Sequence, residues 1–366
     1  MTRAILAFTV LLSILVLACA HQYKEKTIIS SEKIGVGVLK GPESIAWDPV
    51  QSDILYTGIS DGSIMRVNVT SGDSTVYAYS VPGLDATQRA TCGVSVLNEP
   101  LCGRVLGLTF DKDNNLIVSD AYKGLLRISR ADPSQVETLV NSYNGIPFKM
   151  VNSVIILKDG RTVYFTDSSM VYARLQFVAI VVANKPDGRL FKFDLVTKQL
   201  ELVISDLRFA NGIAVSKDES FLVINECSAS RIRRYYLKGH KQGTNDVFVE
   251  DIGGYADNIK ADDEGNFLVG LYSETTSEIT AIHASTKLQN IFLNYVPALN
   301  TLQMIDPMGL VKKVNRHGKI VSAFVDRTAT FALRVSEADI HDGYLYLCSV
   351  LNPWLTRVNL ASGLQL

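Results

Sequence analysis

The chain has 366 residues, of which 47% are hydrophobic and 20% are charged. This composition provides enough apolar side chains for a large core and excludes a generally disordered chain. Lys and Arg together number 36 and Asp and Glu number 37, so the formal net charge is −1. A nearly neutral chain has no overall field to attract nucleic acid or an anionic membrane surface, and neither is expected as an electrostatic partner.

The N-terminus has the pattern of a secretory leader. Arg3 precedes the uncharged run AILAFTVLLSILVLACA over residues 4–20, and Ala18 and Ala20 fit a cleavage site before His21. The pattern predicts a signal peptide over residues 1–20 and a secreted chain. An apolar run of about 17 residues is also the shortest that spans a bilayer, so a membrane-anchored chain with an uncleaved signal anchor stays open. A loose match to a bacterial lipoprotein motif ending at Cys19 is a third interpretation.

The cysteines beyond the leader fall into two pairs with different surroundings. Cys92 and Cys102 bracket a loop-like stretch with Gly and Pro, and a disulfide between them would close that loop. Cys227 and Cys348 lie in strand-like runs, where a free buried cysteine behaves as a small hydrophobic residue. No local feature supports a bond between these two. Asn68 begins the sequon NVT, which predicts N-glycosylation.

From residue 40 onward the chain repeats one all-β pattern. An apolar run is followed by an acidic or glycine turn, a second apolar run, and another turn and strand, and no Pro/Ser-rich linker interrupts the series. Copies begin at Ile45, Leu108, Val154, Ile213, Ile259 and Ala338. Six copies of about 55 residues are typical of propeller repeats, whereas a large β-sandwich or barrel would leave the repetition unexplained. The sequence therefore predicts one six-bladed β-propeller over residues 21–366.

Polar residues stand directly before several of these copies. If each copy begins with the innermost strand of a blade, the residues before it converge on one end of the central channel. They are Glu43, Asn152, Asn211, Asp257 and Asn258. Carboxylate and amide oxygens are the ligand type that Ca²⁺ prefers. Asn and Asp before strands also cap turns in many proteins, but their recurrence at one phase of the repeat favours a metal site.

Other reaction classes lack their motifs. The 5 histidines form no zinc-binding arrangement, and the sequence has neither a Gly-x-Ser-x-Gly elbow nor a phosphate-binding loop. The basic run RIRRYYLKGHK, residues 231–241, is expected at a solvated outer strand rather than at a nucleic-acid site. The apolar insertion of residues 273–307 is interpreted either as a lid or membrane-contacting surface at the channel mouth, or as outer strands of the fifth blade.

Several stretches together resemble the animal branch of the strictosidine synthase-like family. They include GPESIAWD, LCGRVLGLTFD, VYFTDSS, RFANGIAVSKDESFLV, GYADNI and HDGYLYLCSVLNPWL, and the resemblance extends from about residue 41 to residue 360. It implies a six-bladed propeller that shares its architecture with paraoxonases and the senescence marker protein/gluconolactonase group. It also implies a disulfide between Cys92 and Cys102, and it implies as metal-site residues Glu43, Asn152, Asn211, Asp257 and Asn258.

Two departures from that family bear on activity. The catalytic glutamate of genuine strictosidine synthases corresponds to Ser336, with Glu337 one step away, so Pictet–Spengler condensation is not expected. The catalytic histidine of paraoxonases has no counterpart in residues 105–107, which read VLG, so lactonase chemistry that depends on this histidine is not expected either.

The combined expectation is an extracellular, Ca²⁺-dependent hydrolase of small esters or lactones with arylesterase-like activity. Water would attack a carbonyl polarised by the metal, and Asp257 would be the general base. The alternative is a non-catalytic extracellular propeller in which Ca²⁺ is structural and the blade loops bind a protein or glycan. Any membrane association would come through the N-terminal segment.

Overall fold

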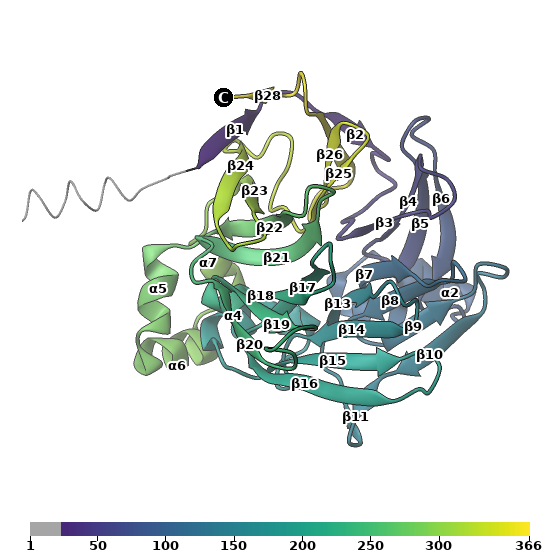
Figure 1. The fold of residues 1–366 in the computed structure, drawn as a ribbon, viewed down its shortest axis with the longest axis horizontal. Coiled ribbons are helices and arrows are strands. Elements are labelled where there is room, and N and C mark those ends of the chain that lie inside the picture. Colours follow the sequence, from purple (N-terminus) through teal and green to yellow (C-terminus); the bar gives the residue numbers. More distant parts are fainter. Residues whose placement is uncertain (1–22) are drawn as a thin grey trace, which may run out of the picture.

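The computed structural model describes residues 23–366, which form a ring of six antiparallel blades around a central channel (Figure 1). The predicted all-β, six-bladed propeller is confirmed. The predicted leader over residues 1–20 lies outside the described residues. Between residues 23 and 366, no helix has the length and apolar character that crossing a bilayer requires.

The repeat copies coincide with the blades, because each copy begins in an innermost strand. The first blade contains β3 (Ile45–Trp47), β4 (Ile54–Gly58), β5 (Ser63–Asn68) and β6 (Ser74–Tyr79). The second contains β7 (Val105–Phe110), β8 (Leu116–Asp120), β9 (Gly124–Ile128) and β10 (Val136–Val140). The third contains β13 (Val151–Ile156), β14 (Thr162–Asp167), β15 (Gly188–Asp194) and β16 (Leu200–Leu207). The fourth is β17 (Ala210–Val215), β18 (Phe221–Glu226), β19 (Arg231–Tyr236) and β20 (Asn245–Val249). The fifth contains β21 (Gly254–Ala261), β22 (Phe267–Glu274), β23 (Gly309–Val314) and β24 (Ile320–Asp326). The sixth contains β25 (Ala338–His341), β26 (Tyr344–Leu347) and β27 (Leu355–Asn359).

Both ends of the chain close the ring. β2 (Glu32–Ile34) is the outermost strand of the sixth blade and pairs antiparallel with β27, where Ile34 faces Leu355. β1 (Lys24–Ile28) lies parallel to β24 of the fifth blade and also pairs with the C-terminal β28 (Leu364–Gln365). Opening the ring therefore requires breaking strand pairs between distant parts of the chain. The repeat pattern does not predict this closure, because β1 and β2 precede the first copy.

The core lies between neighbouring blades, which explains why many strands are apolar on both faces. All residues of β8 and of β18 are buried, and their sequences, LIVSD and FLVINE, show little alternation. One such layer contains Ile117 and Leu125 of the second blade with Val163 and Phe165 of the third. Each blade thus depends on its neighbours for burial.

Helices interrupt this regular pattern mainly on one side of the ring (Figure 1). The turn η2 (Arg174–Gln176) and α4 (Phe177–Ala183) join β14 to β15. The helices α5 (Ser277–His283), α6 (Thr286–Tyr295) and α7 (Ala298–Leu302) join β22 to β23 and pack against α4. The insertion of residues 273–307 is therefore a helical layer and not a set of outer strands.

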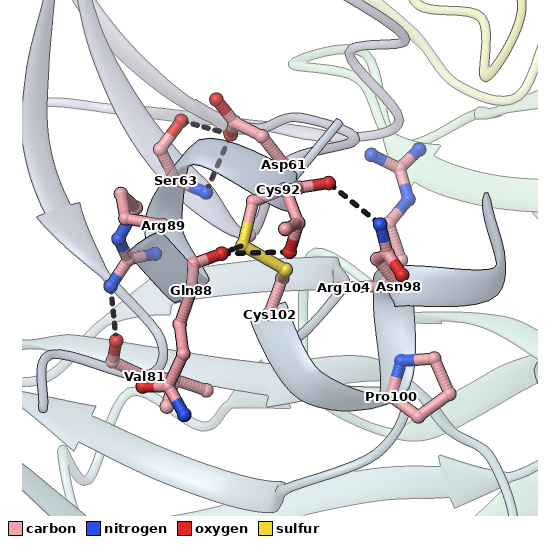
Figure 2. Close-up of a disulfide and its surroundings, with 12 residues drawn as sticks. Asp61, Ser63, Val81, Gln88, Arg89, Cys92, Asn98, Pro100, Cys102 and Arg104 are labelled. Carbon is pink, nitrogen blue, oxygen red and sulfur yellow. Dashed lines mark hydrogen bonds between the residues drawn. A yellow bond between two sulfur atoms is a disulfide. The ribbon is translucent and has the colours of Figure 1, made fainter. Parts of the chain in front are cut away.

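The connection between β6 and β7 is held by a disulfide. It contains α2 (Ala86–Thr91), η1 (Val96–Asn98) and α3 (Glu99–Cys102). Cys92 and Cys102 are joined at an S–S distance of 1.99 Å, as predicted, and Figure 2 shows Arg104 close by. Cys227 and Cys348 are buried and free. The remaining short elements are β11 (Ser142–Tyr143), β12 (Ile146–Pro147) and η3 (Cys227–Ala229).

Two surface predictions have different outcomes. The basic run falls on β19, the third strand of its blade and not the outermost one, and it is partly neutralised, since Arg231 and Arg233 both bind Glu226. Glycosylation of Asn68 stays a prediction. Its Nδ2, the atom that a glycan would modify, donates a hydrogen bond to Asp53 at 2.8 Å.

The closing strand provides a direct test of the architecture. Ile34 is 5% exposed in β2, whereas Val36, two residues on, is 62% exposed. We expect Ile34→Ala to lower the free energy of unfolding by about 2–5 kcal/mol, because it removes buried contacts from the ring closure. Val36→Ala should change it by less than about 0.5 kcal/mol. Chemical denaturation of both variants measures the difference, and equal stabilities would contradict this role for β2.

Candidate functional site

A cavity of about 300 Å³ lies at the end of the channel where the innermost strands begin. Four of the predicted site residues line it: Glu43, Asn152, Asn211 and Asp257. They come from four different blades, so the expectation that the repeat phase brings them together is met. The fifth, Asn258, is buried beside Asp257 but does not line the cavity.

Local irregularities in the strands place these side chains. The predicted position directly before a strand is wrong for three of the four residues that line the cavity: Asn152 and Asn211 are the second residues of their strands, and Asp257 is the fourth residue of β21. In each blade the pairing register shifts at this point, between residues 151 and 154, 210 and 213, and 256 and 259. Such a bulge breaks the strict alternation of a strand and changes the direction of a side chain. The same shift in three blades therefore explains their common placement.

Glu43 is buried and held from two sides. Arg104 Nη2 donates to Glu43 Oε2 at 3.2 Å and to the carbonyl of Gly41 at 2.8 Å. The Ser336 hydroxyl donates to the Glu43 carbonyl at 2.7 Å. Burial raises the pKa of Glu43 above its ordinary value, and the nearby Arg104 guanidinium offsets part of this rise. No donor to Oε1 is found within residues 23–366, so this oxygen is free to bind another group.

The asparagines present amide oxygens that lack partners. Asn152 Nδ2 donates to Ser168 Oγ at 3.0 Å, and Ser168 in turn donates to the carbonyl of Ala210, which fixes the orientation of the amide. The buried Oδ1 atoms of Asn152, Asn211 and Asn258 have no hydrogen-bond partner in the described chain. A buried polar atom without a hydrogen-bond partner destabilises the folded protein by about 1–3 kcal/mol. Several such atoms in one place are therefore expected where a ligand binds.

Asp257 is the fourth polar residue at the base of the cavity, which we call the polar floor and which consists of Glu43, Asn152, Asn211 and Asp257. Burial raises the pKa of its carboxyl group well above the ordinary value, and the negative charge of Glu43 raises it further. A hydrogen bond from Asn211 and the charge of Arg174 offset part of this rise in the pKa. In the absence of a cation, burial therefore makes the ionised form of Asp257 costly.

The rest of the cavity wall is largely apolar and comes from the helical layer. Phe177, Val178 and Val181 of α4 line it together with Ile279 of α5 and Leu302 of α7. Aromatic residues of the fourth and fifth blades, Phe209, Tyr255 and Tyr272, also line it. A polar floor beneath an apolar wall suits a small molecule with one polar reacting group and a hydrophobic body.

The repeat pattern does not identify three charged residues that line the cavity: Glu99, Arg104 and Arg174. Arg104 stands directly before β7 but four residues before the copy at Leu108, whereas the predicted residues that line the cavity stand two residues before theirs, so the repeat phase does not mark it. Glu99 and Arg174 lie in connections between strands, where the repeat phase gives no information.

Ser336 and Glu337 have supporting positions and do not line this cavity. Glu337 Oε1 accepts from the backbone N–H of Ile45 at 2.7 Å and from Lys260 Nζ at 3.3 Å. It lines a second hollow of about 400 Å³ further along the innermost strands, with Lys260 and Asp339. Its carboxylate therefore lies apart from the polar floor.

The described residues include no group of three or more His, Cys, Asp or Glu side chains that could hold a metal. Of the five predicted ligands, only Glu43 and Asp257 are carboxylates. Any cation bound here would consequently depend on the amide oxygens of Asn152 and Asn211 as well.

Comparison with known proteins agrees with this architecture. Residues 152–240 match the strictosidine synthase family, and residues 29–67 match the N-terminal part of strictosidine synthase-like proteins. The adipocyte plasma membrane-associated protein of Gallus gallus is 32% identical over 90% of this chain and 78% of its own length. Strictosidine synthase-like protein 3 of Arabidopsis thaliana is 30% identical over 92% of this chain and 87% of its own length.

Solved structures share the fold at low identity. A gluconolactonase from Xanthomonas campestris has a TM-score of 0.59 and 14% identity, with 89% of each chain covered. Regucalcin from Agrobacterium tumefaciens, described as a calcium-binding protein, has a TM-score of 0.58 and 12% identity, with 91% of this chain and 94% of that chain covered.

The position of Glu337 predicts a pH dependence of stability. Burial raises its pKa to about 7 in the folded protein, above the ordinary 4.5. Because the folded state holds this proton more tightly than the unfolded state, stability should fall as the pH rises from about 4.5 through about 7. Glu337→Gln should remove this contribution, of the order of 1–3 kcal/mol between pH 5 and pH 8.

Denaturation at several pH values measures the effect. Glu264→Gln is the control, since that side chain is 75% exposed and should leave the pH dependence as in the wild type. A Glu337→Gln variant with the wild-type slope would show that Glu337 titrates normally.

Proposed function

Because the chain belongs to the strictosidine synthase-like family, we propose that it is a Ca²⁺-dependent hydrolase of esters or lactones. The observation that carries the proposal is the convergence of Glu43, Asn152, Asn211 and Asp257 on one cavity with an apolar wall. The similar propellers named gluconolactonase and calcium-binding regucalcin support it through their shared fold.

The residues of the cavity floor fit a calcium ion by their chemistry. Ca²⁺ takes six to eight oxygen ligands from carboxylates, amides and water. Glu43 and Asp257 would supply carboxylates, and the unpartnered Oδ1 atoms of Asn152 and Asn211 would supply neutral oxygens. Asn258, which does not line the cavity but is buried next to Asp257, has a further unpartnered Oδ1. A cation here would compensate both the carboxylates, whose pKa values are raised by burial, and the amide oxygens without partners. The cavity beside them leaves space for a substrate and water.

When bound, Ca²⁺ would supply the Lewis acidity that polarises a substrate carbonyl and stabilises the negative charge that develops on its oxygen. Asp257 would accept the proton from the attacking water as general base. Arg104 and Ser336 would keep Glu43 in place through their hydrogen bonds to its carboxylate and its carbonyl. The apolar side chains of α4 and α5 would bind the substrate body and exclude bulk water.

The location proposed for this activity is extracellular, with the chain either secreted or anchored by its N-terminal segment. The leader pattern of residues 1–20 supports this location. The disulfide between Cys92 and Cys102 also supports it, since disulfides persist mainly in oxidising compartments.

Activity should depend on the metal and on Asp257. We expect the purified chain to hydrolyse phenyl acetate or members of a small lactone panel with Ca²⁺, and to lose this activity in EDTA. Asp257→Asn should lower kcat/KM by at least about 100-fold, because it removes the proposed base and one ligand. Asp263→Asn makes the same change in an exposed turn after β21 and should keep full activity.

Absence of hydrolysis in every condition, with Ca²⁺ still stabilising the wild type, would contradict the proposed enzyme. That result would instead support a non-catalytic propeller with a structural calcium ion.

Stability should respond to Asp257→Asn with opposite signs in the absence and presence of Ca²⁺. In EDTA at neutral pH the variant should melt about 2 °C higher than the wild type, since it removes a buried carboxylate that costs free energy when ionised. At a hundredfold excess over Kd, Ca²⁺ should stabilise the wild type by about 2.7 kcal/mol and the variant much less. Differential scanning calorimetry tests both signs, and equal calcium responses would exclude Asp257 as a ligand.

A further inference from the structure

Arg174 lines the cavity without a hydrogen-bond partner for its guanidinium group. It is the first residue of η2, at the start of the connection that carries α4. Its Nε is buried and unpartnered, and the other nitrogens of the group donate no hydrogen bond to the described residues. The charge of the group nevertheless interacts with the carboxylates of Glu43, Glu99 and Asp257. Its closest aromatic contact is the ring of Phe177, whose centroid is 5.8 Å from Cζ. An arginine with unused donors inside a cavity suits a ligand that accepts hydrogen bonds.

Arg104 adds further unused donors in the same cavity. Its side chain is 1% exposed, and Nη2 alone makes both of its hydrogen bonds, to Gly41 and Glu43. Nη1 and Nε are buried without partners. A guanidinium has five N–H donors in a planar fork that matches the two oxygens of a carboxylate. The cavity therefore holds two such groups, neither of which is saturated by the protein.

The charge balance of the cavity indicates what these donors could bind. Glu43, Glu99 and Asp257 line it with Arg104 and Arg174, so three carboxylates face two guanidiniums and the net charge is −1 when all are ionised. A calcium ion would change this balance to +1. One anionic group on a ligand would then neutralise the cavity, and the apolar wall would hold the remainder of the molecule.

We propose that Arg174, assisted by Arg104, forms an anion-binding subsite that selects substrates with a carboxylate group on a hydrophobic body. This inference rests on the proposed function, because it uses the charge of the bound calcium ion and refines the substrate class of the same cavity. The preferred substrate is then an ester or lactone that carries a free carboxylate apart from the bond that is hydrolysed. Arg174 sets specificity, while Arg104 also positions Glu43.

Binding of two matched probes tests the subsite without any catalytic step. 4-Phenylbutyrate and 4-phenylbutanol share a hydrophobic body and differ in the carboxylate. In the presence of Ca²⁺, isothermal titration calorimetry should show the acid binding at least about tenfold more tightly than the alcohol, the expected contribution of charge-assisted hydrogen bonds. Arg174→Gln should reduce this preference to less than about twofold and leave the affinity for the alcohol unchanged.

Two further variants sharpen the comparison. Arg174→Lys keeps the charge but loses the planar fork, so its preference for the acid should be intermediate. Arg316→Gln removes an arginine whose side chain is 63% exposed and which does not line the cavity, and it should behave as the wild type. Circular dichroism confirms that each variant is folded.

Three outcomes would overturn the subsite. Equal affinity of the wild type for acid and alcohol would show that no carboxylate is recognised. Failure of both probes to bind would show that the cavity does not accept such molecules. A preference for the acid that survives Arg174→Gln but disappears in EDTA would assign the carboxylate to the metal ion.

The subsite and the proposed hydrolase can fail separately. A wild type that prefers the acid through Arg174 yet hydrolyses no ester or lactone retains the subsite and excludes the enzyme. Metal-dependent hydrolysis without preference for the acid retains the enzyme and excludes the subsite.

Discussion

Closure of the ring is the constraint on which the rest of this molecule depends. β2 pairs with β27 more than 300 residues later in the chain, and the segment that follows β2 leads directly to Glu43. Across the same junction, the Ser336 hydroxyl reaches the Glu43 carbonyl and the Glu337 carboxylate accepts from Ile45 N–H. The contacts that join the first and sixth blades therefore also hold a residue of the cavity floor. Stability and site geometry are linked at this point.

The cavity floor departs from the rule that buried polar groups are satisfied. The side-chain oxygens of Asn152 and Asn211 lack partners there, and burial makes the ionised forms of Glu43 and Asp257 costly. Between packed apolar layers, a group of buried polar atoms without hydrogen-bond partners is expected where a ligand binds.

The sequence predicts the blades well because each buried strand has to fill the space between two neighbours, and this requirement repeats along the chain. The same phase identifies Asn152, Asn211 and Asp257, since equivalent positions meet at the channel. It does not identify Arg174, which lies in an irregular connection whose path depends on packing against distant helices. β2 escapes prediction for a related reason. The three residues EKI carry almost no pattern, and only their pairing with β27 makes them a strand.

The floor and the wall of the cavity are encoded by separate stretches of the chain. The blades supply the polar floor, whereas two insertions, residues 174–183 and 277–302, supply much of the apolar wall. The entropic cost of lengthening a connection grows only slowly with its length. Changes in these insertions can therefore reshape the space offered to a substrate while the ring and its reacting groups stay intact. This division gives evolution, and protein engineers, a way to diversify ligand choice on one invariant scaffold.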